Sequence, residues 1–280
     1  MYGVDQLTDY TGYLLRTAFL KMSMVTARHF EPGTHPRDAG VLIALLSGGP
    51  TSQQELATRL NVNRTVMVKL IDSLEQRGHV ERIRNPENRR AYALQPTLAG
   101  REALLELLPR MERAEAELTA PLSAADVERL KALLRELIGP APAALGQRLG
   151  FLLSKAHHRF HDRADEVLEP LGIQIRHFGV LKTIAGGVPS QRELADRLSV
   201  SGPVVVEMVD ALEAKGYVAR RRHPSDRRSN TLVVTPPGKT VVNELTERLS
   251  AASGELTAPI GIEGDRELRS LLRKLLGLGD

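Results

Sequence analysis

The chain has 280 residues, of which 42% are hydrophobic and 26% charged, as in ordinary globular proteins of about two domains. It has no cysteine, which excludes disulfide frameworks, thiolate zinc sites and cysteine nucleophiles and is typical of an intracellular protein. The formal net charge is only +4, which is a weak indication of nucleic-acid binding. Aromatic residues make up only 4%, so a surface that stacks unpaired bases is not expected.

The N-terminal segment, MYGVDQLTDY, has Asp5 where a signal peptide needs a basic region followed by an apolar one. Apolar runs such as VLIALL, which begins at Val41, fall far short of the ~18 residues that cross a bilayer. We therefore expect a cytoplasmic protein with no export signal and no membrane partner.

The chain repeats itself with a shift of 138 positions. This shift aligns QQELATRLNV at Gln53 with QRELADRLSV at Gln191, and it gives 22 identities over the 48 positions from Gln53 to Gly100. A period of this size indicates duplication of a complete folding unit, because solenoid repeats are much shorter. We expect a first repeat over residues 1–138, a linker over 139–146 and a second repeat over 147–280.

The expected linker, GPAPAALG, ends the helical pattern before it because its prolines and glycines disfavour a helix. A linker of about eight residues spans at most ~28 Å when extended. The end of the first repeat must therefore lie near the start of the second, and we expect the repeats to touch.

Each repeat opens with the same three expected helices. A long apolar-periodic helix covers about Leu7–Phe30 or Arg148–Leu168, and a short helix runs through VLIALLS or FGVLKTIA. The third helix begins with a capping box, in which a serine oxygen accepts a backbone N–H and a glutamate reaches back. The capping pairs are Ser52 with Glu55 and Ser190 with Glu193.

A turn at Asn61–Asn63 or Ser199–Gly202 leads to a fourth helix, which ends at Gly78 or Gly216 in the left-handed conformation that glycine tolerates. Two short strands follow, VERIR and AYALQ in the first repeat and VARRR and NTLVV in the second. Two helices close each repeat, and the last one has a leucine face. These leucines are Leu130, Leu133, Leu134 and Leu137, matched by Leu268, Leu271, Leu272 and Leu275.

A helix, a tight turn, a second helix and a two-stranded ribbon indicate a winged helix-turn-helix, whose second helix fits the major groove of DNA. The expected fold is mainly α with small β-hairpin wings: two winged helix-turn-helix domains plus a helical dimerisation-type region. Arginines at a ribbon tip suit a narrow minor groove, although the alternative is a solvated, charged hairpin. The hairpin arginines are Arg82, Arg84, Arg89 and Arg90 in the first repeat and Arg220, Arg221, Arg222, Arg227 and Arg228 in the second.

These features resemble the MarR family of winged-helix transcription regulators over nearly all of each repeat. The resemblance rests on a helix ending in Leu, a short turn, a helix with Asp and Leu-Glu near its end, a Gly stop and a Pro-x-Asp-Arg-Arg wing tip. Family members are homodimers with intertwined terminal helices, so the resemblance implies a fused dimer in which two repeats replace two subunits. Such a chain would act as a monomeric pseudo-dimer, and further dimerisation stays open.

The resemblance places the base-reading positions on the fourth helix of each repeat. Arg64 and Lys69 can reach guanine edges or phosphates, and Thr65 can reach a phosphate or a thymine methyl group. In the second repeat Gly202 and Glu207 replace both basic residues, and a glutamate facing the groove would repel phosphate unless it accepts a hydrogen bond from a cytosine amino group, so base reading by this helix stays open. The positions are Asn63, Arg64, Thr65, Val66, Val68 and Lys69, matched by Ser201, Gly202, Pro203, Val204, Val206 and Glu207.

At the wing tips, the resemblance matches Arg90 and Arg228 to the family's minor-groove arginine. The family's aspartate beside it is Asp226 in the second repeat but Asn88 in the first, so an arginine-orienting ion pair is not expected in the first wing.

Pro203 near the start of the fourth helix of the second repeat is compatible with the fold, because the first helical position needs no N–H donor.

Many relatives release DNA when a small amphipathic or aromatic acid binds between the dimerisation helices and the winged domain, so the resemblance implies such a cleft and such a ligand. The alternative for these positions is a snorkelling or satisfied side chain beside the core. The candidate lining residues are Tyr13, Arg16 and Arg37 from the first repeat and His157, Arg176, His177 and Phe178 from the second.

His157 and His161 are four residues apart and would share one face of a helix with His158 beside them, a spacing that can bind zinc. No third ligand is identifiable, so we expect neither a metal site nor a cofactor. The sequence also lacks, at recognisable spacing, a nucleophile with a base, paired carboxylates or a cofactor loop, so an enzyme is not expected.

The sequence therefore favours a transcriptional regulator, more specifically a repressor, that binds a double-stranded DNA operator and is released by a small molecule. Its half-sites are expected to be unequal and ~34 Å apart, one turn of DNA. The alternative is a sequestering protein-interaction module that has lost operator reading, because the second repeat contains the apolar run PVVVEMV. A simpler interpretation makes Val205, Met208 and Val209 core residues, with only Val204 and Glu207 outward.

Overall fold

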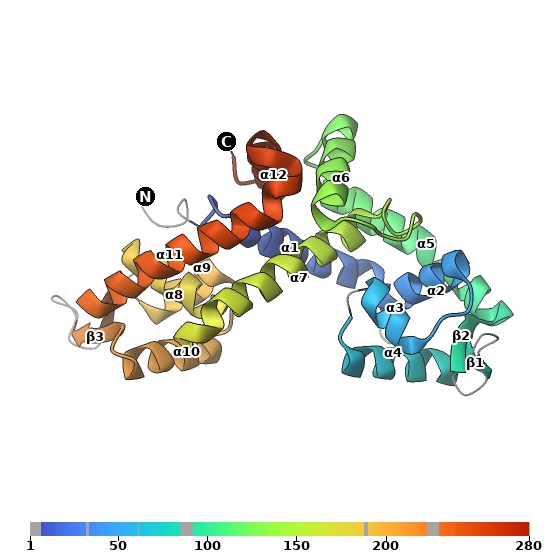
Figure 1. The fold of residues 1–280 in the computed structure, drawn as a ribbon, viewed down its shortest axis with the longest axis horizontal. Coiled ribbons are helices and arrows are strands. Elements are labelled where there is room, and N and C mark those ends of the chain that lie inside the picture. The colour runs from blue at the N-terminus through green and yellow to red at the C-terminus, as the bar shows by residue number, and fades with distance from the viewer. Residues whose placement is uncertain are drawn as a thin grey trace. The chain divides into compact units, whose positions relative to one another are not determined.

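The computed structural model describes residues 7–31, 34–60, 62–84, 92–187, 190–222 and 230–279, and within them it is mainly helical with two small hairpins (Figure 1). The first repeat contains α1 (Thr11–His29), α2 (Pro36–Gly48), α3 (Gln53–Leu60), α4 (Arg64–Gln76), β1 (Val80–Arg84), β2 (Tyr92–Pro96), α5 (Leu98–Thr119) and α6 (Ala124–Ile138). The second contains α7 (Leu149–Leu168), η1 (Glu169–Leu171), α8 (Ile175–Ala185), α9 (Gln191–Leu198), α10 (Gly202–Ala214), β3 (Val218–Arg222), β4 (Asn230–Val234), α11 (Pro236–Thr257), η2 (Ala258–Ile260) and α12 (Gly261–Leu276).

The local signals that set these boundaries act as the sequence predicts. The Ser52 and Ser190 hydroxyl oxygens accept the N–H groups of Glu55 and Glu193, each at 3.2 Å, and so begin α3 and α9. Gly78 and Gly216 follow α4 and α10 with φ of 71° and 73°, a left-handed conformation that suits glycine. One boundary differs, because α1 begins at Thr11 and not near Leu7.

The chain divides into two compact units whose boundaries do not coincide with the repeats. We call residues 15–158 and 263–280 the first-repeat unit, and residues 1–14 and 159–262 the second-repeat unit. Each unit therefore contains the winged helix-turn-helix of one repeat together with helical segments from both repeats.

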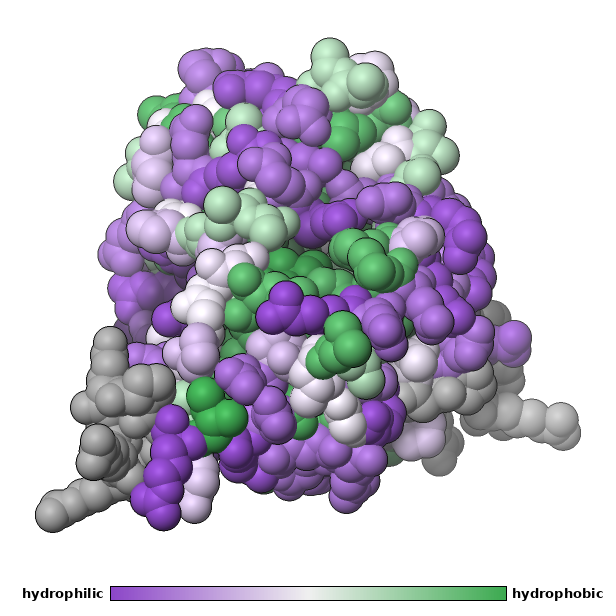
Figure 2. Space-filling view, turned by 90° about the vertical axis from the view of Figure 1, so that its right-hand side faces the viewer, coloured by the Kyte–Doolittle hydropathy of each residue, from purple (hydrophilic) through white to green (hydrophobic). Residues whose placement is uncertain are grey.

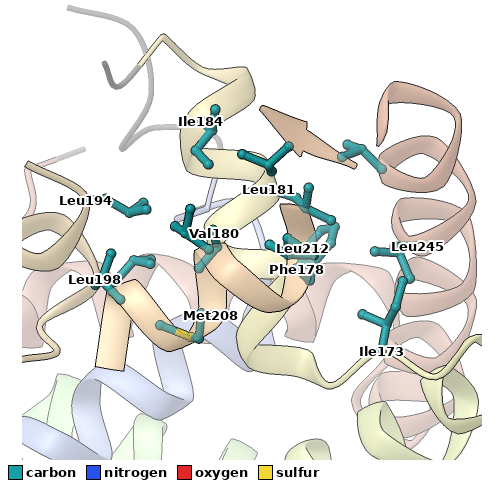
Figure 3. Packing of buried hydrophobic residues seen from close by; sticks show 14 of the residues in the cluster. Ile173, Phe178, Val180, Leu181, Ile184, Leu194, Leu198, Met208, Leu212 and Leu245 are labelled. Carbon is teal, nitrogen blue, oxygen red and sulfur yellow. The ribbon is translucent and has the colours of Figure 1, made fainter. Parts of the chain in front are cut away.

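The core of the second-repeat unit lies between α8, α9, α10 and α11 (Figure 3). Leu181, Leu194 and Val209 are fully buried there. The start of the chain packs against this core through Leu7, Tyr10 and Tyr13, although these residues belong to the first repeat in sequence. The segment before and at the start of α1 thus completes the hydrophobic core around the second winged domain.

The core of the first-repeat unit includes the segment that we expected to be a linker. Leu145 is only 1% exposed and packs with the buried side chains of α2, α3 and α4. Arg135 Nε donates a hydrogen bond to the Gly146 carbonyl oxygen at 3.1 Å, and Glu115 accepts the N–H of Leu149 at 3.2 Å. The connection between α6 and α7 is therefore held by side chains of α5 and α6.

Each wing is an antiparallel pair of strands that directly follows the second helix of its helix-turn-helix. In the first wing Arg82 pairs with Leu94, and in the second wing Arg220 pairs with Leu232. Val80 and Val218, at the strand starts, are 2% exposed and fix each wing against its core.

One face of the molecule is mostly hydrophilic (Figure 2). Figure 2 views the molecule from the side on which Figure 1 labels α2 to α5 and β1–β2, and shows a small group of apolar side chains near the middle of that face. No helix in the described part of the chain is both long and apolar enough to span a membrane.

Candidate nucleic-acid interface

The second helix of the first helix-turn-helix, α4, has one buried face and one exposed face. Met67, Ile71 and Leu74 are fully buried in the core. The opposite face exposes Arg64, Thr65, Val66, Val68 and Lys69, which are the positions expected to meet DNA. Neither Arg64 nor Lys69 forms an ion pair with any residue that the structure describes, so both cations can reach a phosphate or a guanine edge.

Asn63 has a structural role at the start of this helix. Its Oδ1 accepts the N–H of Val66 at 2.9 Å and so caps α4. The side chain remains exposed, and its amide NH2 group is the part that can reach a phosphate. Ser201, which lies 138 positions after Asn63, precedes α10 without a side-chain cap hydrogen bond. Pro203 lies in the first turn of α10, which is an intact helix.

The second recognition helix, α10, buries the apolar residues that prompted the sequestering alternative. Val205, Met208 and Val209 are at most 2% exposed, so they are core residues as the simpler interpretation predicts. The outward residues differ slightly from the expectation, because Val206 is 42% exposed while Val204 is partly buried against the core. One exposed valine is an ordinary surface feature and not an apolar patch.

Glu207, the acidic residue on the outer face of α10, is neutralised within its own unit. Arg176 Nη2, from the first turn of α8, lies 3.3 Å from Glu207 Oε1. In the first repeat the second residue of α2 is Arg37, just as Arg176 is the second residue of α8, and the residue 138 positions before Glu207 is Lys69; both are cationic. The first repeat thus offers two cations where the second offers an ion pair with no net charge.

The expected wing-tip contacts divide between the described strands and the loops beyond them. Arg89, Arg90, Arg227 and Arg228, and the neighbouring Asn88 and Asp226, lie outside the described residues. Arg84 and Arg221 are exposed near the ends of β1 and β3, and Arg222 is the last described residue of β3. The described strands therefore test only the side-chain positions of Arg82, Arg84, Arg220 and Arg221 among the expected wing arginines.

Arg82 and Arg220 hold the wings to the recognition helices, a contact that we did not expect from the sequence. Arg220 Nη2 lies 2.5 Å from Asp210 Oδ1, and Arg220 Nη1 pairs with Glu213, both on α10. Arg82 pairs with Asp72, at 3.2 Å, and with Glu75 on α4 in the same way. Partial burial acts to lower the pKa of Arg220, but the hydrogen bonds that its guanidinium donates to Asp210 and Glu213 outweigh it and raise that pKa. These arginines fix the angle of the wing, and their charge is already compensated.

Replacing Arg220 with alanine should therefore loosen the second wing. We expect the free energy of unfolding to fall by about 1 kcal/mol, because a partly exposed pair of ion bridges is lost. DNA affinity should fall as well, since the wing is no longer fixed to α10. Thermal unfolding and duplex binding of the same variant measure both effects.

Arg221→Ala is the matched control, because Arg221 is the next residue of β3 and is exposed. It should lower DNA affinity without a change in unfolding temperature. If Arg220→Ala and Arg221→Ala behave alike in both measurements, Arg220 does not hold the wing.

The candidate ligand residues are divided between the two units. Tyr13, Arg176, His177 and Phe178 belong to the second-repeat unit, whereas Arg16, Arg37 and His157 belong to the first-repeat unit. Phe178 is 4% exposed, and its ring meets that of Tyr10 edge to face at 5.6 Å. The structure therefore places Tyr13 and Phe178 in the same hydrophobic cluster, but it does not place all seven candidates in one unit.

His177 has a structural partner within α8. Its Nδ1 lies 3.2 Å from the N–H of Gln174, which it accepts as part of the helix cap. Burial lowers the pKa of His177, and the charges of Arg176 and Lys215 lower it further. The neutral ring is thus the form that this cap stabilises.

The remaining histidine candidates also have partners. His157 stacks on Phe19 with ring centroids 4.7 Å apart, and His158 Nδ1 lies 2.7 Å from the Ser154 carbonyl oxygen. His161 Nδ1 lies 3.4 Å from an oxygen of Asp165. Among the described residues, no group of three or more histidine, aspartate or glutamate side chains could hold a metal ion.

A buried ion pair that the sequence analysis missed braces α4 at its far end. Asp38 in the first turn of α2 has a side chain only 3% exposed, and its Oδ2 accepts a hydrogen bond from Arg77 Nη2 at 2.9 Å. Arg77 is the C-cap residue of α4, so the pair fixes the recognition helix to α2. No sequence signal pointed to it, because the partners are 39 residues apart.

Sequence comparisons match both repeats to one family. A family model described as the MarR family matches residues 33–91 and 171–229, one stretch in each repeat. A putative transcriptional regulatory protein for the hcr operon of Thauera aromatica is 32% identical over 115 residues, which is 41% of this chain and 67% of that protein.

Solved structures similar to this chain include regulators with and without DNA. CouR from Rhodococcus jostii RHA1 bound to p-coumaroyl-CoA is 30% identical, and the match covers 40% of this chain and 80% of that one with a TM-score of 0.38. Apo MarR from E. coli is 28% identical, covering 46% and 96% with a TM-score of 0.42. A MarR variant from E. coli complexed with operator DNA is 28% identical, covering 46% and 93% with a TM-score of 0.43.

Proposed function

The chain belongs to the MarR family of DNA-binding transcriptional regulators, and from this premise we propose that one chain binds one double-stranded operator as an intramolecular pseudo-dimer with unequal half-sites. The family consists of transcriptional regulators and not of enzymes, which agrees with the two helix-turn-helix units of this chain. Such a regulator would act in the cytoplasm, where the operator is.

The difference between the two recognition helices carries the proposal of unequal half-sites. The outer face of α4 presents Arg64 and Lys69 to DNA, whereas the outer face of α10 has Gly202 and a Glu207 already paired with Arg176. Arginine and lysine read guanine edges in the major groove, and glycine reads none. One half-site would therefore be specified by bases and the other held mainly by the second wing.

The second wing has the means to hold a half-site without base reading. Its arginines include Arg221 and Arg222 at the end of β3, and the sequence between β3 and β4 adds Arg227 and Arg228. Phosphate contacts of this kind position a protein on the duplex and supply affinity that does not depend on sequence. The expected result is a strong, salt-dependent but weakly specified contact.

We further propose that the regulator is a repressor and that a small aromatic or amphipathic acid releases it. Tyr10, Tyr13 and Phe178 share one hydrophobic cluster, and Arg176 and His177 directly precede Phe178 on α8, which supports an acid of this kind in the second-repeat unit. Aromatic acids that weaken duplex binding by wild-type protein but not by Tyr13→Ala would support this site, and acids without effect would count against it.

Duplex binding at several salt concentrations tests the central proposal. A regulator should lose affinity steeply with salt, with a log–log slope of about −0.9 for each phosphate contact. Arg221→Ala should make the slope shallower by about 1, because one such contact is removed. Little duplex binding at any salt concentration would instead indicate the sequestering module.

A further inference from the structure

The two repeats meet through counterpart residues, meaning residues 138 positions apart. In the first-repeat unit, Phe19 of α1 stacks on its own counterpart, His157 of α7, with ring planes 24° apart. In a symmetric dimer of identical subunits, a residue that contacts its own counterpart lies at the two-fold axis. A self-contact there would join two identical residues, but here it joins Phe and His.

Two further contacts are reciprocal in the same way. A Cβ atom on Gly12 would lie 3.3 Å from Phe160 in the second-repeat unit, and a Cβ on Gly150 would lie 3.0 Å from Met22 in the first-repeat unit. Gly12 and Gly150 are counterparts, and so are Met22 and Phe160. Contacts in which i meets j and j meets i are those of an isologous dimer interface.

The last helices of the two repeats, α6 and α12, are joined by an ion pair between counterpart residues. Arg129 of α6 donates from Nε and Nη2 to the two carboxylate oxygens of Glu267 of α12, at 2.9 and 2.6 Å. These residues are counterparts. If the first repeat paired with a second copy of itself, arginine would meet arginine, and in the second repeat glutamate would meet glutamate.

A second ion pair follows the same rule. Lys274 Nζ lies 2.5 Å from Asp126 Oδ2, and this hydrogen bond, with those from Ser123, lowers the pKa of Asp126 to about 2. The counterpart of Lys274 is Glu136. Self-pairing of the first repeat would therefore bring Asp126 against a glutamate.

The pattern of change between α6 and α12 separates packing from charge. The four buried leucines of the repeated face are identical in the two helices. Three charged positions are reversed in sign, namely Glu128 and Arg266, Arg129 and Glu267, and Glu136 and Lys274. The leucine face is the same in both helices and cannot distinguish them, whereas the reversed charges can.

We propose that the Arg129–Glu267 and Asp126–Lys274 pairs are specificity determinants that make α6 accept α12 of the second repeat and reject another α6. The partner that fits the α6 surface is thus the second repeat and not a second copy of the first. The pairing is independent of the DNA-binding proposal, and a failure of either leaves the other standing.

Single charge reversals in the full-length protein recreate the self-contacts and test this proposal. Glu267→Arg produces the arginine–arginine contact of the first repeat with itself, and Arg129→Glu produces the glutamate–glutamate contact of the second. At low salt we expect each to lower the unfolding temperature by about 2–3 °C. Arg129→Gln and Glu267→Gln, which remove attraction without adding repulsion, should lower it by about half as much.

The exchange of both charges should restore the pairing. The double variant Arg129→Glu/Glu267→Arg is expected to unfold within about 1 °C of the wild type, and all differences should shrink in 1 M salt, where the Debye length is about 3 Å. Adding Lys274→Glu to Glu267→Arg gives α12 the charges of α6 at both positions and should roughly double the loss.

Arg248 and Glu244 provide the matched control, because they form an exposed ion pair within one helix, α11. Reversal of Arg248 should shift the unfolding temperature by less than the reversals at Arg129 or Glu267. The proposal is overturned if the like-charge variants are as stable as the glutamine variants, or if the exchange variant is no more stable than the single reversals.

Discussion

Replacing Arg64 and Lys69 with alanine is expected to remove most of the sequence-specific binding to operator DNA. Each change should cost about 1–3 kcal/mol of binding free energy, because each removes a cation from the groove-facing side of α4. Both side chains are exposed, so the free energy of unfolding should hardly change. Duplex titrations at fixed salt, with thermal unfolding of the same samples, measure the two quantities.

Glu207→Gln in α10 is the matched control at the counterpart of Lys69. It removes a negative charge from the second recognition helix and leaves Arg176 without its carboxylate partner. Binding should stay within about 1 kcal/mol of the wild type or become tighter, because an exposed ion pair is worth little and repulsion from phosphate is reduced. Loss of affinity equal to that of Arg64→Ala would show that α10 reads DNA as α4 does.

The largest expected effect on stability comes from Gly238, at the start of α11. A Cβ atom at this position would lie 2.1 Å from the carbonyl oxygen of Tyr217, which already accepts the N–H of Thr235 at 3.0 Å. Because the contact is with backbone, no side chain can move aside. We expect Gly238→Ala to lower the free energy of unfolding by about 3 kcal/mol or more, as judged by thermal or denaturant unfolding.

Gly254→Ala makes the same substitution in the same helix at an open position, where an added Cβ would meet nothing within 4 Å. It should stabilise the protein by about 0.5–1 kcal/mol, because alanine favours a helix more than glycine does. Gly100 is the counterpart of Gly238 in the first repeat, and a Cβ atom there would lie 2.0 Å from the His79 carbonyl oxygen. Gly100→Ala should therefore cause a similar loss of stability. Equal stability of Gly238→Ala and Gly254→Ala would contradict the close approach.

Local chemistry explains why much of the fold could be predicted from the sequence. A serine followed three residues later by glutamate, or a glycine after a helix, acts through neighbours in the chain, and the caps at Ser52 and Ser190 are confirmed. The burial of Val205, Met208 and Val209 likewise follows from helical spacing alone.

The roles of the wing arginines show where this reasoning stops. Arg82, Arg84 and the tip arginines look alike in the sequence, as cations of one basic hairpin. Only the three-dimensional distance to Asp72 and Glu75 shows that Arg82 is a brace. The same holds for Arg176, which we expected at a ligand site and which pairs with Glu207 across two helices.

The exchange of segments between the repeats was implied only by the family resemblance and could not be predicted from the residues themselves. Tyr10 and Tyr13 lie in the first repeat by sequence, yet they pack on the core of the second winged domain. An amphipathic helix shows which face is buried but not which partner covers it. The contacts between counterpart residues of α1 and α7, and of α6 and α12, show which helix covers which.

Selection of bound fragments from random duplex DNA tests most directly whether one chain provides two different DNA-binding modules. We expect recovered fragments to contain two half-sites about one helical turn apart, one with a defined base sequence and one with little base preference beyond a narrow minor groove. Arg64→Ala/Lys69→Ala should erase the defined half-site and leave the other unchanged. Fragments with two equally specified half-sites, or no enrichment of duplex DNA at all, would contradict the account.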